Sequence, residues 1–221
     1  MNNMNGKLIV IEGADGSGKT TQFNQLKNHL EAENIKVETT HFPRHETPFF
    51  GIMVDQYLDG EFGDPTKLNP KLASLLYAMD RWEARPRIEH WLEKGLVLLD
   101  RYTTSNQGHQ LSKLNDDNEA GDQFLDWLDE LEYNVLKIPK PDLVIFLDVP
   151  VKFIKELLAK RGGQPDLHEK NLSYLEATQK AYRYVAEKYD YWRRIDCVEN
   201  NKLLPIETIH NKIWKIIKAM L

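Results

Sequence analysis

The chain has 221 residues, of which 41% are hydrophobic and 29% are charged, and this size and composition predict a single α/β domain with a sizeable core. Its formal net charge of −5 excludes the basic field that binding to a nucleic acid polymer would need. The single cysteine, Cys197, excludes an internal disulfide framework. No apolar run reaches the roughly 20 residues of a membrane span, and residues 1–6 do not resemble a signal peptide, so we expect a cytoplasmic protein with no membrane segment.

Short apolar runs alternate with helical patterns along the chain. The apolar runs predict strands at 8–12, 36–40, 96–100, 143–147 and 194–198. Apolar residues at helical spacing predict helices at 20–33, 70–93, 122–136, 151–161, 171–189 and 206–220. This alternation favours a doubly wound parallel sheet of about five strands, in which ligands bind beyond the carboxyl ends of the strands.

The segment after the first predicted strand, residues 13–20, reads Gly-Ala-Asp-Gly-Ser-Gly-Lys-Thr and fits the pattern of a phosphate-binding P-loop. Glycines let the backbone N–H groups turn toward phosphate oxygens, and the helix that follows directs its positive end at the anion. Lys19 would reach the terminal phosphates of ATP, and the Thr20 hydroxyl would ligate Mg²⁺. The predicted ATP-binding residues are Gly13, Ala14, Asp15, Gly16, Ser17, Gly18, Lys19, Thr20 and Thr21.

A second polar cluster stands where the strand at 96–100 ends, with Asp100 followed by Arg101. In P-loop proteins an Asp in this place helps to hold Mg²⁺. An arginine beside a nucleotide pocket suits a phosphate, because its planar guanidinium can bond two oxygens at once. The alternative is a surface ion pair between the two side chains, which would contribute little.

Two further segments place arginines near the expected cleft. Tyr77 and Arg81 are four residues apart in the helix at 70–93, so they share a face, where Tyr77 could stack on a base while Arg81 holds a phosphate. Arg44 follows Pro43 after the second strand and would point into the cleft. Taken alone, an aromatic residue and an arginine at this spacing are more often core and solvated rim than functional, and Arg44 alone is weak evidence.

Two polar segments are predicted to be irregular. Residues 108–121 are rich in polar and turn-forming residues, which is typical of a surface loop. Residues 162–170 begin with two glycines after a predicted helix. Their composition is that of a hinged lid, and a plain loop would look similar.

In their order along the chain, these motifs resemble those of the thymidylate kinases. The resemblance spans residues 7 to about 198 and rests on the segments 12–19, 42–45, 81–83, 100–102 and 139–148. It implies a P-loop NTPase fold with a short lid at 162–170, and a homodimer formed through helices on one side of the sheet.

The resemblance also implies a role for individual residues. Arg44, Arg81 and Arg101 would hold or orient the phosphate of the acceptor nucleotide. Tyr77 stands where the family stacks an aromatic ring on thymine, and Asp15 matches a carboxylate that meets the 3′ hydroxyl of the acceptor.

Three positions on the helix that follows Arg101 complete this set. Ser105 and Asn106 fall where members of the family hydrogen-bond the base. His109 stands at a position that is often Tyr or Phe, next to the deoxyribose, where an aromatic ring disfavours a 2′ hydroxyl.

The chain departs from the family in its catalytic arginine. Members of the family carry this arginine in the P-loop or in the lid, whereas residues 14–17 and 162–170 contain none here. Arg161, at the entrance of the lid, is the best candidate for the cation that stabilises the transition state, and Lys170 at its exit is the other. His168 replaces a commoner tyrosine, which puts the contact between lid and acceptor in question.

The expected reaction is transfer of the γ-phosphoryl group of ATP to dTMP, giving dTDP, with Mg²⁺ as cofactor and with Lys19, Arg101, Arg161 and Asp15 as catalytic residues. The acceptor phosphate has a second pKa of about 6 and is already an anion, so no general base is needed. The alternatives are another nucleoside monophosphate, a deoxynucleoside with Glu12 as the base, or a nucleotide-binding relative without activity.

Overall fold

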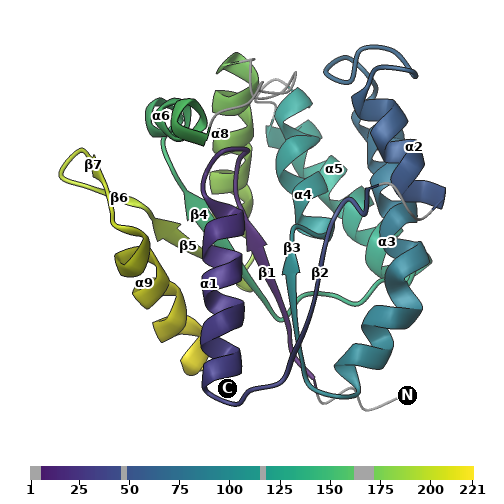
Figure 1. Ribbon diagram of the computed structural model, residues 1–221. Coiled ribbons are helices and arrows are strands. Elements are labelled where there is room, and N and C mark those ends of the chain that lie inside the picture. The colour runs from purple at the N-terminus through teal and green to yellow at the C-terminus, as the bar shows by residue number, and fades with distance from the viewer. Residues whose placement is uncertain (1–5, 46–48, 115–117, 162–171) are drawn as a thin grey trace.

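The structure is a computed structural model that describes residues 6–45, 49–114, 118–161 and 172–221. Five parallel strands form one sheet in the order β2-β3-β1-β4-β5, with helices on both faces, which confirms the predicted doubly wound architecture (Figure 1). The strands are β1 (Leu8–Glu12), β2 (Val37–His41), β3 (Leu96–Asp100), β4 (Leu143–Asp148) and β5 (Trp192–Asp196).

The helices follow the predicted alternation with additions. The larger helices are α1 (Lys19–Ala32), α2 (Phe49–Leu58), α3 (Pro70–Leu92), α5 (Asn118–Asp129), α6 (Val151–Arg161), α8 (Leu172–Lys188) and α9 (Ile206–Lys218). The shorter elements are α4 (Thr103–His109), the 3₁₀ helix η1 (Leu111–Leu114), the π-helical turn η2 (Glu130–Val135) and the antiparallel strands β6 (Val198–Glu199) and β7 (Lys202–Leu203). Of these, α2, α4, η1, β6 and β7 were not predicted.

The sequence places β5 two residues too late. This strand lies at the edge of the sheet, where it pairs only with β4, and its residues Arg193 and Arg194 are exposed. Charged residues are common on edge strands because they discourage pairing with other chains. They interrupt the apolar run on which the prediction rested, so the prediction moved toward Val198.

The prediction of a surface loop at 108–121 is wrong for the residues that the structure describes. Gly108 and His109 end α4, Leu111 begins η1, and Gly121 lies in the first turn of α5. Leu111 is buried among side chains of α5 and α8, and a Cβ on Gly121 would lie 3.2 Å from it. Tertiary packing therefore makes this polar segment helical, against its composition.

Each face of the sheet is covered by its own hydrophobic layer. Ile9 and Ile11 of β1 pack with side chains of α1, α6 and α9, whereas Leu8 and Val10 pack with side chains of α3, α5 and α8. Because β1 is central and covered on both faces, its residues are buried and apolar until Glu12. Among the described residues, no helix is long and apolar enough to cross a lipid bilayer.

A pair of histidines joins α1 to α9 on one face of the sheet. His29 Nδ1 lies 2.7 Å from His210 Nε2, and the ring of Trp214 stacks on His29 with 4.0 Å between ring centroids. Burial, together with the neighbouring His29, lowers the pKa of His210. The nearby carboxylates are Glu33, which lies 3.8 Å from His29, and Glu207, which favours the charged form of His210.

We expect this pair to make folding less stable in acid. Because the pKa of His210 is lower in the folded chain, the unfolded chain binds more protons as pH falls through about 6.5, and stability decreases by at most about 1.4 kcal/mol per pH unit for one proton. Urea unfolding between pH 7.5 and 5 should show a smaller loss of stability in His210→Gln than in the unchanged protein. His90→Gln removes an exposed histidine and should follow the unchanged protein. If His210→Gln and the unchanged protein lost the same stability between pH 7.5 and 5, His210 would not be the cause of the acid sensitivity.

Candidate active site

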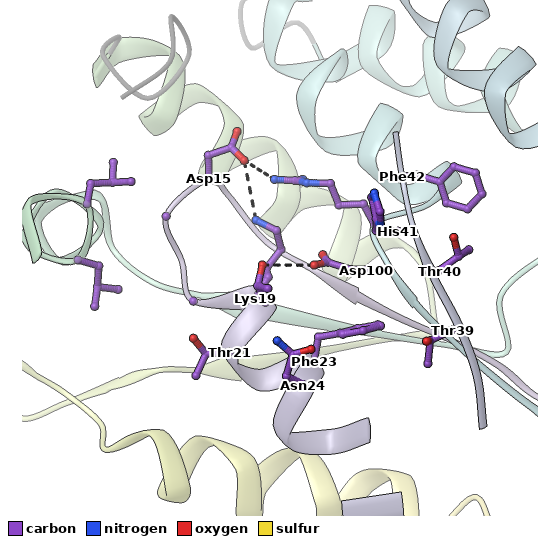
Figure 2. Close-up of a pocket in the computed structure, with 16 residues that line it drawn as sticks. Asp15, Lys19, Thr21, Phe23, Asn24, Thr39, Thr40, His41, Phe42 and Asp100 are labelled. Carbon is purple, nitrogen blue, oxygen red and sulfur yellow. Dashed lines mark hydrogen bonds and ion pairs between the residues drawn. The ribbon is translucent and has the colours of Figure 1, made fainter. Parts of the chain in front are cut away.

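The P-loop connects β1 to α1 with the backbone geometry that its glycines permit (Figure 2). Gly16 and Gly18 have φ angles of 75° and 84°, in the left-handed region that other residues rarely adopt. A Cβ on Gly16 would lie 2.8 Å from the side chain of Leu158, so the loop also packs closely against α6. Helix α1 begins at Lys19, and its first backbone N–H groups face the loop as an anion site.

Lys19 is held inside this loop. Its Nζ donates a hydrogen bond of 2.8 Å to the carbonyl oxygen of Ala14 and lies 3.9 Å from Asp15. Burial and the neighbouring Arg101 lower the pKa of Lys19 to about 8. A phosphate in the loop would give this ammonium group an anion closer than the carboxylate of Asp15.

A cavity of about 740 Å³ extends from the P-loop toward β2 and β3 (Figure 2). The residues that line it are Asp15, Gly16, Gly18, Lys19, Thr20, Thr21, Phe23, Asn24, Thr39, Thr40, His41, Phe42, Asp100, Arg101, Leu157 and Leu158. Its size suits a nucleotide. Six of the predicted ATP-binding residues line this cavity, namely Asp15, Gly16, Gly18, Lys19, Thr20 and Thr21. The other three, Gly13, Ala14 and Ser17, lie in the same loop.

Thr20 and Asp100 form the part of this cavity that fits a magnesium ion. The Thr20 hydroxyl donates to Asp100 Oδ2 at 3.4 Å, which brings two hard oxygen donors together at the foot of the loop. Within the described ranges, no group of three or more His, Cys, Asp or Glu side chains could hold a metal. Mg²⁺ commonly binds through one or two carboxylates together with phosphate oxygens, so this donor set suits it.

A second cavity, of about 210 Å³, lies between α3, α4 and α8. The residues that line it are Asp15, Phe42, Pro43, His45, Leu58, Tyr77, Arg81, Arg101, Tyr102, Ser105, Asn106, His109, Gln110 and Tyr174. Asp15, Phe42 and Arg101 line both cavities, so the two spaces meet at these residues.

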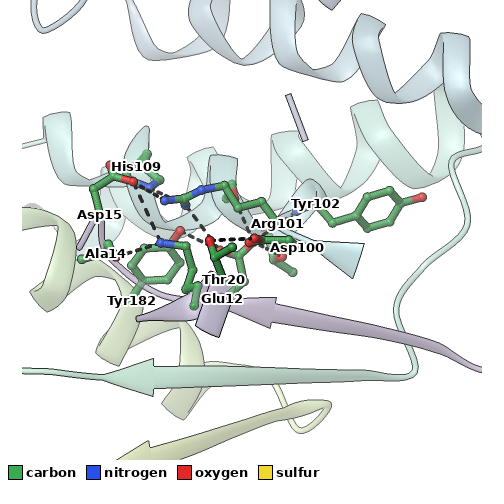
Figure 3. A network of polar contacts seen from close by, with 12 residues as sticks. Glu12, Ala14, Asp15, Thr20, Asp100, Arg101, Tyr102, His109 and Tyr182 are labelled. Atoms are coloured by element: carbon green, nitrogen blue, oxygen red, sulfur yellow. Dashed lines mark hydrogen bonds and ion pairs between the residues drawn. The ribbon is translucent and has the colours of Figure 1, made fainter. Parts of the chain in front are cut away.

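Arg101 stands at this junction in an unusual backbone conformation. Its φ angle is 64°, and its backbone N–H donates to the carbonyl of Ile11 at 3.1 Å. Non-glycine residues in this region are uncommon and cluster at functional sites. The guanidinium donates to Asp15 and lies 3.0 Å from His109 Nε2 and 3.8 Å from Glu12 (Figure 3). Burial opposes the charge on Arg101, but Asp15 and other neighbours outweigh it and raise its pKa.

Glu12 is the buried centre of a hydrogen-bond network behind Arg101 (Figure 3). Its Oε1 accepts from the hydroxyls of Thr104 and Ser105, at 2.7 and 2.8 Å, and from the N–H of Tyr102 at 3.3 Å. Its Oε2 accepts from the Tyr182 hydroxyl at 2.9 Å. Both carboxylate oxygens of Glu12 therefore accept hydrogen bonds from the protein itself. Ser105 also lines the second cavity, but its hydroxyl donates to Glu12.

Arg44 does not reach either cavity in the structure. Its Nε donates to Asp80 at 2.9 Å and its Nη2 to Glu83 at 3.1 Å, so the side chain lies against α3. It is not among the residues that line the two cavities. The structure thus places Arg44 on carboxylates of α3, and its contact with the acceptor phosphate stays a prediction.

Arg81 lines the second cavity but lies away from the P-loop. Its guanidinium is buried and forms two hydrogen bonds with Glu132, of 2.7 and 2.5 Å. Burial works against its charge, but Glu132 outweighs this and raises the pKa of Arg81. Asn106 binds the same carboxylate at 3.0 Å, so Arg81 and Asn106 stand together at one end of the cavity.

Aromatic side chains form much of the remaining wall. Tyr77 meets Tyr57 edge to face, with 5.9 Å between ring centroids, and burial raises its pKa well above the usual range. His109 Nδ1 lies 2.8 Å from the hydroxyl of Tyr174 on α8. The structure thus brings Tyr77 and His109 to one cavity as expected, and adds Tyr174, which no local sequence pattern indicates.

The lid residues 162–170, including His168 and the candidate cation Lys170, lie outside the described residues. Arg161, the other candidate cation, is the last residue of α6. Because Leu158 of this helix packs against Gly16, the end of α6 lies beside the P-loop.

Comparison with known proteins gives one consistent family. Residues 11–213 match the family model described as thymidylate kinase. The chain is 31% identical to thymidylate kinase of Plasmodium falciparum over 214 residues, which cover 95% of this chain and 89% of the relative. It is 32% identical to thymidylate kinase of Schizosaccharomyces pombe over 182 residues, which cover 80% and 79% of the two chains.

The fold agrees with this relationship. A solved structure of thymidylate kinase from Candida albicans superposes with a TM-score of 0.75 at 26% identity, over 97% of this chain and 92% of that one. The family model spans the P-loop, the residues that line both cavities and the strand ends beside them. The resemblance drawn from the sequence is confirmed: the chain belongs to the thymidylate kinase family.

Proposed function

We propose that this chain transfers the γ-phosphoryl group of ATP to the phosphate of dTMP, giving dTDP. The observation that carries the proposal is the meeting of two cavities at Asp15 and Arg101. One cavity is built on a P-loop and suits a nucleoside triphosphate, and the other is narrow and aromatic and suits a nucleoside monophosphate. An arginine between them can hold the two reacting phosphates together.

On the donor side, the backbone N–H groups of the P-loop and Lys19 would hold the phosphates of ATP. Thr20 and Asp100 would hold Mg²⁺. When bound, the ion neutralises charge on the β- and γ-phosphates.

On the acceptor side, Arg101 would bind the phosphate of dTMP, and Asp15, which its guanidinium contacts, would meet the 3′ hydroxyl. Tyr77 would stack on the base, with Asn106 at its polar edge and His109 beside the sugar. Because Glu132 already balances its charge, we assign Arg81 to the base edge and no longer to the phosphate.

Catalysis then depends on position and charge. The acceptor phosphate is an anion with a second pKa of about 6, so no side chain has to remove a proton. The main obstacle is repulsion between two polyanions, which Lys19 and Arg101 would offset in a partly dry site. We propose Arg161 as a further cation, because α6 ends beside the P-loop.

A deoxynucleoside acceptor is the second candidate, and it would require Glu12 to act as a base toward a 5′ hydroxyl. The four hydrogen bonds that Glu12 accepts from the protein argue against this role. A coupled assay of ADP release with dTMP, dUMP, dCMP, AMP and thymidine separates the candidates. Turnover of thymidine instead of dTMP would favour the deoxynucleoside, and none with any acceptor would favour a relative without activity.

We also propose that the chain forms a homodimer through α2 and α3, which lie side by side at the right of Figure 1. Leu72, Leu75 and Trp82 are exposed along one side of α3, and Phe49 and Ile52 are exposed on α2. A second copy could cover this apolar surface with the same surface of its own.

A cytoplasmic location remains a prediction from the sequence.

The cations of the P-loop and the junction should be essential for turnover. Lys19→Ala and Arg101→Ala should each lower kcat/KM for dTMP at least about a hundredfold, because each removes charge stabilisation from the transition state. Circular dichroism should show that both variants remain folded. Lys27→Ala, on the exposed side of α1, should keep normal turnover. Near-normal activity in a folded Lys19 or Arg101 variant would contradict the assignment.

Turnover should require a divalent cation bound by Thr20 and Asp100. Excess EDTA should abolish ADP release, and added Mg²⁺ should restore it. Asp100→Asn should raise the Mg²⁺ concentration needed for half of the maximal rate, because an amide is a weaker ligand for a hard cation. The hypothesis fails if the protein works at full rate in EDTA.

The dimer should depend on the apolar surface of α3. Trp82→Glu places a charge on a side chain that is 43% exposed, and should shift the chain from dimer to monomer in light scattering across a concentration series. Ile206→Glu changes an exposed apolar residue on α9, at 56%, and should leave the dimer intact. A monomeric unchanged protein at every concentration would refute the proposed dimer.

A further inference from the structure

The π-helical turn η2, which follows α5, places one carboxylate behind the residues that line the second cavity. The wide turn is marked by the hydrogen bond of 2.9 Å from the Leu136 N–H to the Leu131 carbonyl, five residues back. Its residues Glu130 and Val135 face solvent, whereas Glu132 is 1% exposed. Such turns interrupt a regular helix and often occur at functional sites. The chain therefore places a buried charge here by a specific departure from α-helical geometry.

Glu132 connects two residues that line the second cavity, although it does not line the cavity itself. Its Oε2 accepts from Arg81 Nε at 2.7 Å, and its Oε1 accepts from Arg81 Nη2 at 2.5 Å. The same Oε1 accepts from the side-chain amide of Asn106 at 3.0 Å. One carboxylate thus holds both polar groups at this end of the cavity.

These contacts determine which way the amide of Asn106 faces. Its Nδ2 donates to Glu132 and, at 3.2 Å, to the backbone carbonyl of Ser74. A carboxylate paired with Arg81 and a peptide carbonyl can only accept hydrogen bonds, so the group that faces them must be the NH₂. The carbonyl oxygen of Asn106 is then the atom left for a ligand.

Arg81 offers the opposite polarity beside it. A guanidinium has only donors, and Glu132 uses those on Nε and Nη2. The remaining N–H groups, two on Nη1 and one on Nη2, are left for a ligand. The end of the cavity thus presents a hydrogen-bond acceptor from Asn106 next to a donor from Arg81.

We propose that Glu132 is a positioning residue that fixes this acceptor–donor order and so sets which base the acceptor cavity takes. The matching edge has an N–H next to a carbonyl, as N3 and O4 of thymine or uracil have. Cytosine presents the reverse order, an unprotonated ring nitrogen next to an amino group. This role presupposes that a pyrimidine monophosphate is the acceptor, as proposed above.

This role depends on a side chain at position 132 that can only accept hydrogen bonds. A neutral amide in its place can donate as well as accept, so the amide of Asn106 could turn over and present its NH₂ to the ligand. A mispaired base would then no longer leave buried polar groups unsatisfied, which is the origin of strong discrimination.

The test compares kcat/KM for dTMP and dCMP in variants of η2. The unchanged protein should prefer dTMP by at least about a hundredfold, as expected of a site that hydrogen-bonds its substrate. Glu132→Gln should reduce this preference at least about tenfold, through the KM of the acceptor and not that of ATP. Glu132→Asp keeps a group that only accepts, and should retain the preference even if turnover falls.

Glu130→Gln is the matched control, because it makes the same change of charge in the same turn on an exposed side chain that contacts Asn134 at 2.7 Å. It should leave the preference unchanged. An unchanged preference in folded Glu132→Gln, or an equal loss in Glu132→Asp, would overturn the proposal. The first would mean that Glu132 only stabilises the fold, and the second that only its shape matters.

Glu132→Gln leaves the buried Arg81 without a counter-charge and could fail to fold. In that case competition binding of dTMP and dCMP to the unchanged protein decides, and equal affinities would overturn the proposal. A protein that binds dTMP over dCMP but transfers no phosphate would refute the proposed function and support the order of groups assigned here.

Discussion

The buried carboxylate of Glu12 is the constraint around which this site is arranged. A charge at the end of the central strand, without contact with solvent, has to be matched by donors or it would destabilise the fold by several kcal/mol, typically about 3–5. Donors come from the start of α4 and from Tyr182 on α8, and Arg101 lies 3.8 Å away. The same contacts that stabilise Glu12 therefore fix α4 and α8 beside the P-loop, where they form the second cavity.

Lys19 and Arg101 are neighbouring cations at the P-loop. Lys19 is buried and contacts a backbone carbonyl, and its pKa is lowered to about 8 by burial and by Arg101. Asp15 is shared between Lys19 and Arg101. A phosphate that enters between Lys19 and Arg101 would contact both cations. The fold therefore holds the cations in position before a polyanion binds.

The sequence predicts the parts of the site that depend on local pattern. The P-loop follows from glycine spacing, and Asp100 and Arg101 follow from the end of an apolar run, since both signals lie within a few residues of the group that they place. Local pattern did not show which side chains Arg44 and Arg81 contact. Their partners, Asp80 and Glu132, lie 36 and 51 residues away and come close only when the chain folds.

The sequence by itself thus determined the chemistry, a P-loop kinase with cations gathered at the carboxyl ends of parallel strands, because strand, loop and helix signals are local. Tertiary structure alone decided which cations remain available to a ligand. Arg44 and Arg81 pair with carboxylates of α3 and η2, whereas Arg101 pairs with Asp15 of the P-loop, and both residues of that pair line the two cavities. The physical reason is that charge pairing depends on distance in space, and this distance is set by packing of segments that are remote in the sequence.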